Sequence, residues 1–405
     1  MKIIVQKFGG TSLESASGRD AAASRVKKRI AEGYSPVVVV SAMGRRGQPY
    51  ATDTLIDMAR KVNMELPARE KDLLMSVGEV ISAVVTAQTL RREKLEAEAI
   101  TGAQAGIITD DNFNNTRILQ LRPGKVSQIL SRNVIPVIAG FQGVTLEGEI
   151  TTLGRGGSDT TATAIAGALD AEFVEIFTDV SGIMTADPRK VREARIINRA
   201  TYNEVCELAH QGAKVIHPRA AEVAMRYDVP IWVLASLGEE SGTEIKSISA
   251  DEEFELRGDK PVTGLASRTD IDFIKVLPRV QQENATGLGS FRILAKNNIS
   301  VDFINVRPDS ITFVVDREMS GLVRELLDQN KYKYDLTNDF CKITAVGGGM
   351  TGRPGVMATV VEALMGEAIP IFQTTDSITS ISCLIKERDE IRALYALHKA
   401  FRLGE

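Results

Sequence analysis

Residues 1–12, MKIIVQKFGGTS, predict a short apolar strand that runs directly into a glycine loop at the start of a helix. Gly9 and Gly10 let the backbone approach a ligand closely, and the amides at a helix N-terminus favour anions. The chain has no GxxxxGK[ST] motif, and here Lys7 precedes the glycines, so the loop is not a P-loop. From these residues alone, a phosphate site and a tight turn beside a surface lysine both remain open.

Further apolar runs share the character of this first strand. Short, nearly continuous and rich in β-branched residues, such runs are typical of strands buried on both faces of a parallel sheet. Longer amphipathic or alanine-rich stretches between them predict helices. The alternation predicts an α/β fold over residues 1–245, a sandwich of helix layers around a mostly parallel central sheet. The expected strands are 3–8, 37–41, 134–140, 173–178 and 231–234, and the expected helices include 14–32, 71–91 and 160–169.

The C-terminal part contains an internal repeat with an offset of 70 residues. This offset carries residues 273–276 onto 343–346 and Leu294 onto Leu364. Each copy predicts a βαββαβ order, the ferredoxin-like pattern, and leaves sheet edges that should pair with the other copy or with a second chain. A polar, acidic stretch at 239–260 precedes the repeat. We therefore expect an α/β domain at 1–245, a linker at 246–261, and two ferredoxin-like domains at 262–336 and 337–405.

Composition excludes several classes of protein. The chain has 405 residues and a formal net charge of −4, which argues against general nucleic-acid binding. Cys206, Cys341 and Cys383 lie far apart, and with only three histidines they form no sequence-spaced metal cluster. No apolar run approaches the ~20 residues of a membrane span, and the N-terminus lacks a signal peptide. We expect a soluble, cytoplasmic protein that binds neither nucleic acid nor a membrane; its unpaired cysteines fit that compartment.

A second glycine loop, LGRGGS at 153–158, again precedes an expected helix. Ser158 and Asp159 are good N-cap residues, and Arg155 offers a planar fork suited to a carboxylate or a phosphate. A flexible turn with a capping residue is the structural alternative. Glu79 interrupts the apolar helical run 73–81, and if buried it needs a partner such as a substrate ammonium group. A solvated helix end is the alternative there.

Two segments after the fourth expected strand suit a nucleotide. FTDVSG at 177–182 and TADPR at 185–189 lie where open α/β sheets bind ligands, although Asp187 and Pro188 alternatively form only a turn. GGGMTG at 347–352 matches the dinucleotide-binding pattern GxGxxG, but it lies inside the second repeat copy, with too little chain after it for a dinucleotide fold. We interpret it as no NAD site, and His210 and His217 as structural.

Taken together, the sequence resembles the aspartokinases of the amino-acid kinase family over essentially its whole length. The repeat is similar to the paired ACT regulatory domains of those enzymes. The chain most resembles monofunctional, homodimeric aspartokinases of Gram-positive bacteria, and we expect no fused homoserine dehydrogenase after residue 405. The resemblance rests on KFGGTS at 7–12, SAMG at 41–44, LLMSVGE at 73–79, TGAQAG at 101–106, AGFQG at 139–143, TTLGRGGSDTTA at 151–162, FTDVSGIMTADPR at 177–189 and GAKV at 212–215.

The resemblance implies phosphoryl transfer from ATP, with Mg²⁺, to L-aspartate, which yields 4-phospho-L-aspartate for lysine, threonine and methionine synthesis. It implies that Lys7 neutralises charge on the transferring group and that Asp159 orients Lys7 or helps to hold the metal. It further implies that Glu79 accepts the substrate ammonium group and that Arg155 pairs with the α-carboxylate. The other implied contacts are Phe8, Gly9, Gly10, Ser41, Thr178, Asp179, Met184, Arg189, Lys214 and Val215 for ATP, and Thr52, Gly156, Gly157 and Ser158 for aspartate.

The ACT pair implies feedback control by lysine, threonine or diaminopimelate in a homodimer assembled through these domains. The stretch QENATG at 282–287 and Val306 depart from the pattern common in lysine- and threonine-regulated members, which leaves the effector open. Two other functions remain: another carboxylate kinase of this fold, and a non-catalytic amino-acid sensor, which has no reason to keep both glycine loops and Glu79. The expected effector contacts are Gln282, Ser300, Val301, Asp302, Ile369, Pro370, Thr374 and Thr375.

Overall fold

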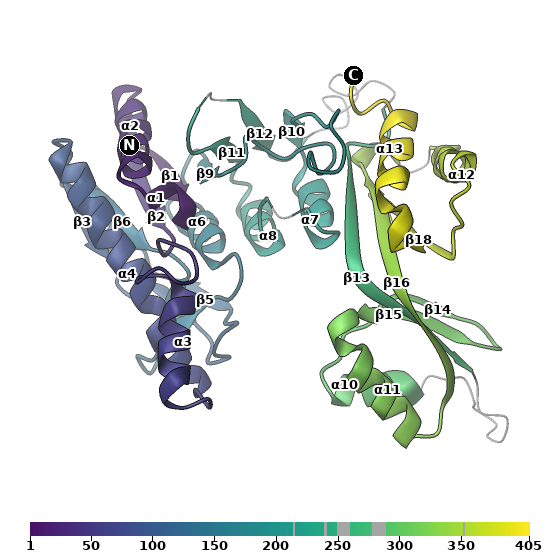
Figure 1. The fold of residues 1–405 in the computed structure, drawn as a ribbon. Coiled ribbons are helices and arrows are strands. Elements are labelled where there is room, and N and C mark those ends of the chain that lie inside the picture. Colours follow the sequence, from purple (N-terminus) through teal and green to yellow (C-terminus); the bar gives the residue numbers. More distant parts are fainter. Residues whose placement is uncertain (214, 239–240, 249–259, 278–288, 351–352) are drawn as a thin grey trace. The chain divides into compact units, whose positions relative to one another are not determined.

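The computed structural model describes the chain except for residues 214, 239–240, 249–259, 278–288 and 351–352 (Figure 1). The chain divides into two compact units. The first comprises Met1–Met184, Ile196–His210 and Lys214–Leu256, and the second comprises Thr185–Arg195, Gln211–Ala213 and Arg257–Glu405. Short pieces from the middle of the sequence therefore belong to the second unit.

An eight-stranded sheet forms the centre of the first unit, in the order β10-β12-β11-β9-β1-β2-β6-β3. Its pairs are parallel except for the antiparallel pair of β11 and β12. The five strands predicted from apolar runs are the five consecutive central strands β11-β9-β1-β2-β6, so the mostly parallel sheet is confirmed. The strands are β1 Lys2–Phe8, β2 Tyr34–Val40, β3 Ala97–Ile100, β6 Ile135–Ala139, β9 Val174–Thr178, β10 Arg199–Ala200, β11 Ile231–Ala235 and β12 Gly242–Ile245.

Helices cover this sheet in layers. Residues of α2 and α4 pack into one core with alternate residues of β2 and β6, whereas α6 contacts β1, β2 and β9 and is itself covered by α8. Figure 1 shows α2 and α4 on one side of the central strands and α6 and α8 on the other. The helices of this unit are α1 Gly10–Leu13, α2 Ala16–Ala31, α3 Thr52–Val62, α4 Ala68–Arg92, α5 Gly124–Leu130, α6 Gly157–Ala168, α7 Tyr202–His210 and α8 Pro218–Tyr227.

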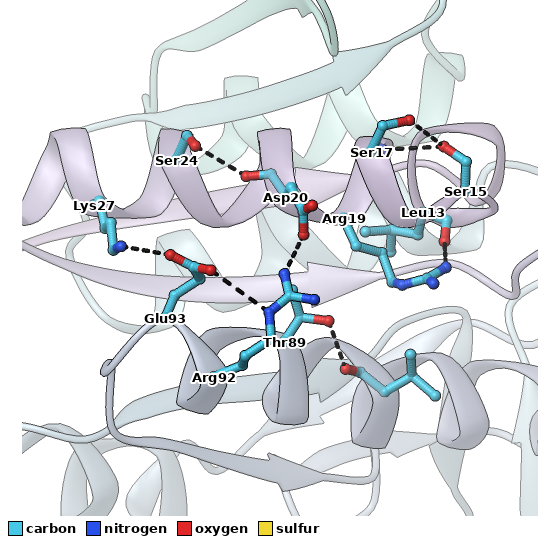
Figure 2. Close-up of polar contacts among 12 residues, drawn as sticks. Leu13, Ser15, Ser17, Arg19, Asp20, Ser24, Lys27, Thr89, Arg92 and Glu93 are labelled. Carbon is cyan, nitrogen blue, oxygen red and sulfur yellow. Dashed lines mark hydrogen bonds and ion pairs between the residues drawn. The ribbon is translucent and has the colours of Figure 1, made fainter.

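Helix α4 is long and apolar enough to cross a membrane by length and composition, contrary to the expectation from apolar runs. Half of the most apolar stretch of α4 is buried inside the structure, and Ala83, Ala87 and Leu90 pack against the sheet. Its composition is therefore that of a core helix. Exposed ion pairs tie it to α2: Lys27 contacts Glu93 at 2.7 Å, and Arg92 contacts Asp20 (Figure 2). Exposed pairs of this kind contribute little to stability individually.

A smaller four-stranded sheet was not predicted from the sequence. It has the order β5-β4-β7-β8, with β4 Ile107–Thr109, β5 Ile118–Leu121, β7 Gln142–Val144 and β8 Ile150–Thr152. Strands of three or four residues are too short to show a periodic pattern. Strand β8 leads directly into the second glycine loop, so this sheet positions that loop.

The second unit is built on a six-stranded antiparallel sheet with the order β14-β15-β13-β16-β18-β17. Its two long strands, β13 Gly264–Leu277 and β16 Lys333–Val346, pair along their length with a bulge near Ile271. The other elements are α10 Gly289–Lys296, β14 Asp302–Val306, β15 Ile311–Asp316, α11 Ser320–Gln329, α12 Val356–Gly366, β17 Gln373–Asp376, β18 Ser380–Lys386 and α13 Glu390–Ala400, with single 3₁₀ turns at Arg317–Met319, Gly348–Met350 and Glu387–Asp389.

The offset of 70 residues carries β14, β15, the following 3₁₀ turn and α11 onto β17, β18, the next 3₁₀ turn and α13. The predicted repeat is thus confirmed, although no strand follows α13 in the described residues to complete the βαββαβ order of the second copy. The copies are nevertheless interlocked, because residues 264–268 pair with 342–346 of the second copy, while 273–277 pair with 333–337. Val262 and Leu265 accordingly lie in the core of the second copy, as do Ala186 and Val191 from the segment 185–195.

Candidate active site

The two glycine loops meet through one ion pair. Lys7 lies near the end of β1 and Asp159 in the first turn of α6, and Lys7 Nζ is 2.7 Å from Asp159 Oδ1. Both side chains are only about a tenth exposed, at 11% and 12%. The structure thus brings together two residues that are 152 positions apart in the sequence. A lysine held in this way is a preorganised positive charge at the point where the two loops meet.

The first glycine loop packs against the loop that follows β2. A methyl group added at Gly10 would lie 2.2 Å from the carbonyl oxygen of Ala42, so a residue without a side chain is required there. Ser41 N donates to Phe8 O at 3.2 Å, and Gly9 N donates to Phe177 O at 3.4 Å. Phe8, Gly9, Gly10 and Ser41 therefore lie together at the carboxyl ends of neighbouring strands, the edge where such sheets bind ligands.

Glu79 lies on α4 and is buried, with 4% of its surface exposed. Its Oε1 accepts a hydrogen bond from Ala42 N at 3.2 Å, and within the described residues its Oε2 has no hydrogen-bond partner. Burial raises the pKa of Glu79 to about 8. The glycine at position 78 lets α4 come close to Ala42 and to Thr52, at the start of α3, since an added methyl would be 2.8 Å from Ala42 Cβ. A buried carboxylate with one unsatisfied oxygen suits a cationic ligand group.

The second glycine loop adopts a left-handed backbone on either side of Arg155. Gly154 has φ +74° and Gly156 has φ +66°, and Gly156 is the N-cap of α6. Ser158 and Asp159, expected as caps, instead lie in the first helical turn, because the glycine at 156 already ends the loop. Arg155 is exposed, and no ion pair of Arg155 is found in the described part of the chain. Gly157 and Ser158, which follow in the first turn of α6, are buried.

The nucleotide contacts expected after β9 are divided between the two units. Thr178 ends β9, and its Oγ1 lies 3.2 Å from Asp179 Oδ1, while Met184 bridges to Ile196. Arg189 belongs to the second unit, where its exposed guanidinium pairs with Asp187 at 2.8 Å, and the hydrogen bond from this side chain lowers the pKa of Asp187. Val215 is half-buried, and Lys214 lies outside the described residues.

Several residues of the site escaped sequence reasoning. Ser236 N donates to Thr178 O at 2.9 Å, and the Ser236 hydroxyl contacts that of Ser12, so these serines tie α1 to the ends of β9 and β11. The ring of His217 packs on Gly156, and burial, together with the charge of Arg219, lowers the pKa of His217. Neither serine stood out, because a single hydroxyl residue carries no sequence pattern of its own.

Within the residues that the structure describes, no group of three or more His, Cys, Asp or Glu side chains could hold a metal ion. A cavity of about 200 Å³ lies beside α2 and is lined by Gln6, Arg25, Lys28, Arg29, Glu175, Phe177, Trp232 and Leu234. Its buried Glu175 is already paired with Arg29 and Gln6.

The expected effector residues lie at the two outer strands of the six-stranded sheet. Asp302 begins β14 and pairs with buried Lys342 of the second copy; burial opposes its ionisation, but Lys342 and the Phe303 amide lower the pKa of Asp302 overall. Ser300 and Val301 precede β14, and Ile369 and Pro370 precede β17, in which Thr374 and Thr375 are both exposed. Gln282 lies outside the described residues.

Comparison with known proteins gives three kinds of match. The amino acid kinase family model matches residues 2–235, and an ACT domain model matches residues 336–399. Aspartokinase 1 of Bacillus subtilis is 44% identical over 405 residues, covering all of both chains. E. coli aspartokinase III with aspartate and ADP in the R-state has a TM-score of 0.80 at 24% identity, covering 98% of this chain and 99% of that one. The same enzyme with lysine and aspartate in the T-state has a TM-score of 0.75 at 24% identity, covering 99% and 100%.

Proposed function

The chain belongs to the aspartokinases of the amino acid kinase family and transfers a phosphoryl group from ATP to L-aspartate, and we propose that its two glycine loops divide this reaction between them. In this proposal the first loop acts on the phosphoryl group and the second on the amino acid. The observation that carries it is the contact of 2.7 Å between Lys7 and Asp159, which joins the loops at one site.

On the phosphoryl side, Lys7 stabilises the negative charge that spreads over the transferring group. Phosphoryl transfer depends almost entirely on positioning and electrostatics, so a fixed cation is the main device the protein has to supply. Asp159 keeps the Lys7 ammonium group in place. The amides of Gly9 and Gly10, at the start of α1, hold phosphate oxygens beside Phe8 and Ser41, and the remaining contacts to ATP come from Thr178, Asp179, Met184, Arg189, Lys214 and Val215.

A magnesium ion fits this site as part of the ATP complex. Mg²⁺ usually keeps several waters and binds through one or two carboxylates together with substrate phosphates. Asp159 is a carboxylate between the two loops that could provide such a ligand. When bound with ATP, the ion neutralises phosphate charge, while Lys7 remains the protein's own cation.

On the aspartate side, Glu79 receives the substrate ammonium group and Arg155 pairs with the α-carboxylate. The unsatisfied Oε2 of Glu79 supports the first role, and the exposed guanidinium of Arg155 supports the second. Thr52, Gly156, Gly157 and Ser158 complete the contacts to the substrate. With both ends of the amino acid held, the side-chain carboxylate is the group left to attack ATP.

The test is a coupled assay of ADP release with aspartate, glutamate and acetylglutamate as alternative substrates. We expect turnover with aspartate only, and we expect Glu79→Ala and Arg155→Ala to raise the KM for aspartate while the KM for ATP stays nearly constant. Arg45→Ala, an exposed arginine, is the control and should change neither. Variants that lose ATP and keep aspartate would show that the two roles are assigned to the wrong ligands.

The ACT pair makes the enzyme a feedback-regulated homodimer in the cytoplasm. The outer strands β14 and β17 are uncovered in a single chain, and Ile304 and Val306 on β14 and Phe372 just before β17 are exposed side chains that a second chain could cover. We place the catalytic domain at 1–245, the linker at 246–261 and the ACT domains at 262–336 and 337–405. The effector, an amino acid such as lysine, threonine or diaminopimelate, binds near Gln282, Ser300, Val301, Asp302, Ile369, Pro370, Thr374 and Thr375.

Regulation is tested on the full-length enzyme at saturating ATP and sub-saturating aspartate, with each effector alone and in pairs. An effector acts only through different affinities for two states, so Asp302→Ala should relax inhibition and leave uninhibited turnover within a few-fold. Asp302→Asn keeps a hydrogen-bond acceptor for Lys342 and serves as the second variant; Asp309→Ala, on the exposed β14–β15 turn, is the control. Sedimentation reports the dimer, and a rate unchanged by every effector would refute the regulatory role.

A further inference from the structure

We propose that Asp72 and Arg219 are positioning residues that hold the second glycine loop from two sides and so fix Arg155 for the aspartate carboxylate. This inference rests on the proposed role of Arg155. Neither residue is placed to touch the substrate in this scheme; both act through the backbone of the loop.

Asp72 lies on α4 and is completely buried, at 0% exposed. Its carboxylate accepts hydrogen bonds from Thr152 N at 2.8 Å and from Thr152 Oγ1 at 2.6 Å. It also accepts from Asn114 N, at 2.9 and 3.0 Å to its two oxygens. Thr152 is the last residue of β8, three positions before Arg155, so Asp72 fixes the point at which the loop leaves the sheet.

The chemistry of these contacts explains why a carboxylate is needed. All the groups that face Asp72 in these bonds are donors, and no ion pair of Asp72 is found in the described part of the chain. An ionised carboxylate is an acceptor only, with room for about four hydrogen bonds. An asparagine amide would turn a donor toward one of these N–H groups, and a buried unsatisfied donor is costly.

Arg219, on α8, holds the same loop from the other side. Its Nη1 donates to Leu153 O at 2.7 Å and to Thr116 O at 3.1 Å, and its Nη2 donates to Asn115 Oδ1 at 3.1 Å. Thr116 N in turn donates to Thr152 O at 3.0 Å. The segments 114–116 and 152–153 are therefore held together by Asp72 at one end and Arg219 at the other.

These contacts also relate the loop to Glu79. Asp72 and Glu79 are seven residues apart on α4, which is close to two helical turns, so both side chains face the same side. One face of a single rigid helix thus carries the acceptor for the substrate ammonium group and the anchor of the loop that binds the α-carboxylate. We infer that this face fixes the separation of the two contacts, and with it the fit of an α-amino acid.

The experiment compares Asp72→Asn and Arg219→Lys with the parent enzyme in full-length form. We expect each to lower kcat/KM for aspartate on the order of tenfold or more, mostly through KM, with the KM for ATP within a few-fold, because small misplacements of a binding group have effects of this size. Glu175→Gln is the matched control: it also alters a buried, hydrogen-bonded carboxylate in the same unit, but the partners of Glu175 are Gln6 and Arg29 and not residues of the loop, so both KM values should stay unchanged.

A double-mutant cycle with Arg155→Ala separates positioning from general damage. If Asp72 acts through Arg155, Asp72→Asn causes little further rise in the KM for aspartate once Arg155 is alanine. Full additivity, or a lower melting temperature with unchanged KM, would overturn the inference. An Arg155→Ala enzyme with normal aspartate KM would instead refute the proposed role of Arg155, so the two failures are distinguishable.

Discussion

The two glycine loops of this enzyme need glycine for different physical reasons. In the first loop Gly9 has an ordinary extended backbone, with φ −69°, and Gly10 is required because Ala42 O leaves no room for a methyl group. In the second loop Gly154 and Gly156 have φ values of +74° and +66°, where a residue with a side chain is strained. Glycine is required in the first loop by close packing and in the second loop by a positive φ angle.

This difference matches the work proposed for each loop. Close packing of the first loop brings backbone amides and buried Lys7 to one point, which suits the charge of a phosphoryl group. The left-handed backbone at Gly154 and Gly156 instead leaves the side chain of Arg155 exposed, where it can bind a substrate reversibly. We therefore expect changes in the first loop to affect turnover and changes in the second to affect the KM for aspartate.

The largest effect should follow from Lys7→Ala. Loss of one preorganised electrostatic group lowers kcat about 100-fold or more, because its stabilisation applies mainly to the transition state. Steady-state kinetics measure this directly, and a melting curve shows whether the fold survives the loss of the buried pair with Asp159. The control is Lys2→Ala, an exposed lysine on the same strand.

Near-normal turnover in Lys7→Ala would break the comparison, because the first loop would then have no special link to phosphoryl transfer. A rise in aspartate KM with unchanged kcat would reverse the two roles.

The pH dependence of aspartate binding is the next largest effect. Burial raises the pKa of Glu79 to about 8, so the carboxylate that should receive the ammonium group is mostly protonated at pH 7 in the free enzyme. Since only the ionised form pairs with a cation, the KM for aspartate should fall about tenfold from pH 7 to pH 9. The KM for ATP serves as the internal control, and Glu79→Gln should remove the dependence.

The raised pKa of Glu79 also makes the free energy of unfolding depend on pH. An acid whose folded pKa lies above its unfolded pKa favours folding at low pH, and this contribution is lost as pH rises from about 4.5 through about 8. Glu79→Gln should therefore gain stability relative to the parent enzyme as pH rises through that range, measured by thermal unfolding. An equal pH profile in both proteins would show that Glu79 does not titrate as proposed.

Sequence patterns predicted the parts of this molecule whose signal is local. The central strands are continuous apolar runs, and the repeat offset aligned β14 and β15 with β17 and β18. The same patterns missed β12, which lies in a polar stretch, and the short strands of the four-stranded sheet. They also could not show that residues 264–268 pair with the second copy, because an offset identifies equivalent positions and not their partners.

The site shows the same division. Lys7, Glu79 and Arg155 stand out because each is a charged residue in a glycine-rich or apolar context. The contact of Lys7 with Asp159 joins distant parts of the chain and has no local signal. Asp72 did have one: it is a carboxylate seven positions before Glu79 in the same apolar helix, and that spacing places both on one face.

The smallest effect should come from the backbone of the second loop, compared in Gly154→Ala and Gly148→Ala. Both residues have positive φ, at +74° and +91°, so each alanine pays a similar strain of about 1–3 kcal/mol. Gly148 lies in the turn between β7 and β8 with no atom within 4 Å of an added methyl, whereas at Gly154 the methyl would be 2.9 Å from Asn115 Oδ1.

We expect both variants to melt at lower temperatures because both carry this strain, and Gly154→Ala to melt at the lower temperature of the two because its methyl group also displaces Asn115. Only Gly154→Ala should raise the KM for aspartate, by a few-fold, since Asn115 belongs to the segment that Arg219 ties to Leu153, and moving it displaces Arg155. The KM for ATP should change in neither variant, because the first loop owes its shape to Ala42 and not to backbone strain. If Gly148→Ala raises the aspartate KM as much as Gly154→Ala does, the effect is one of general stability. The proposed difference between the first loop, shaped by packing, and the second, shaped by positive φ angles, would then fail.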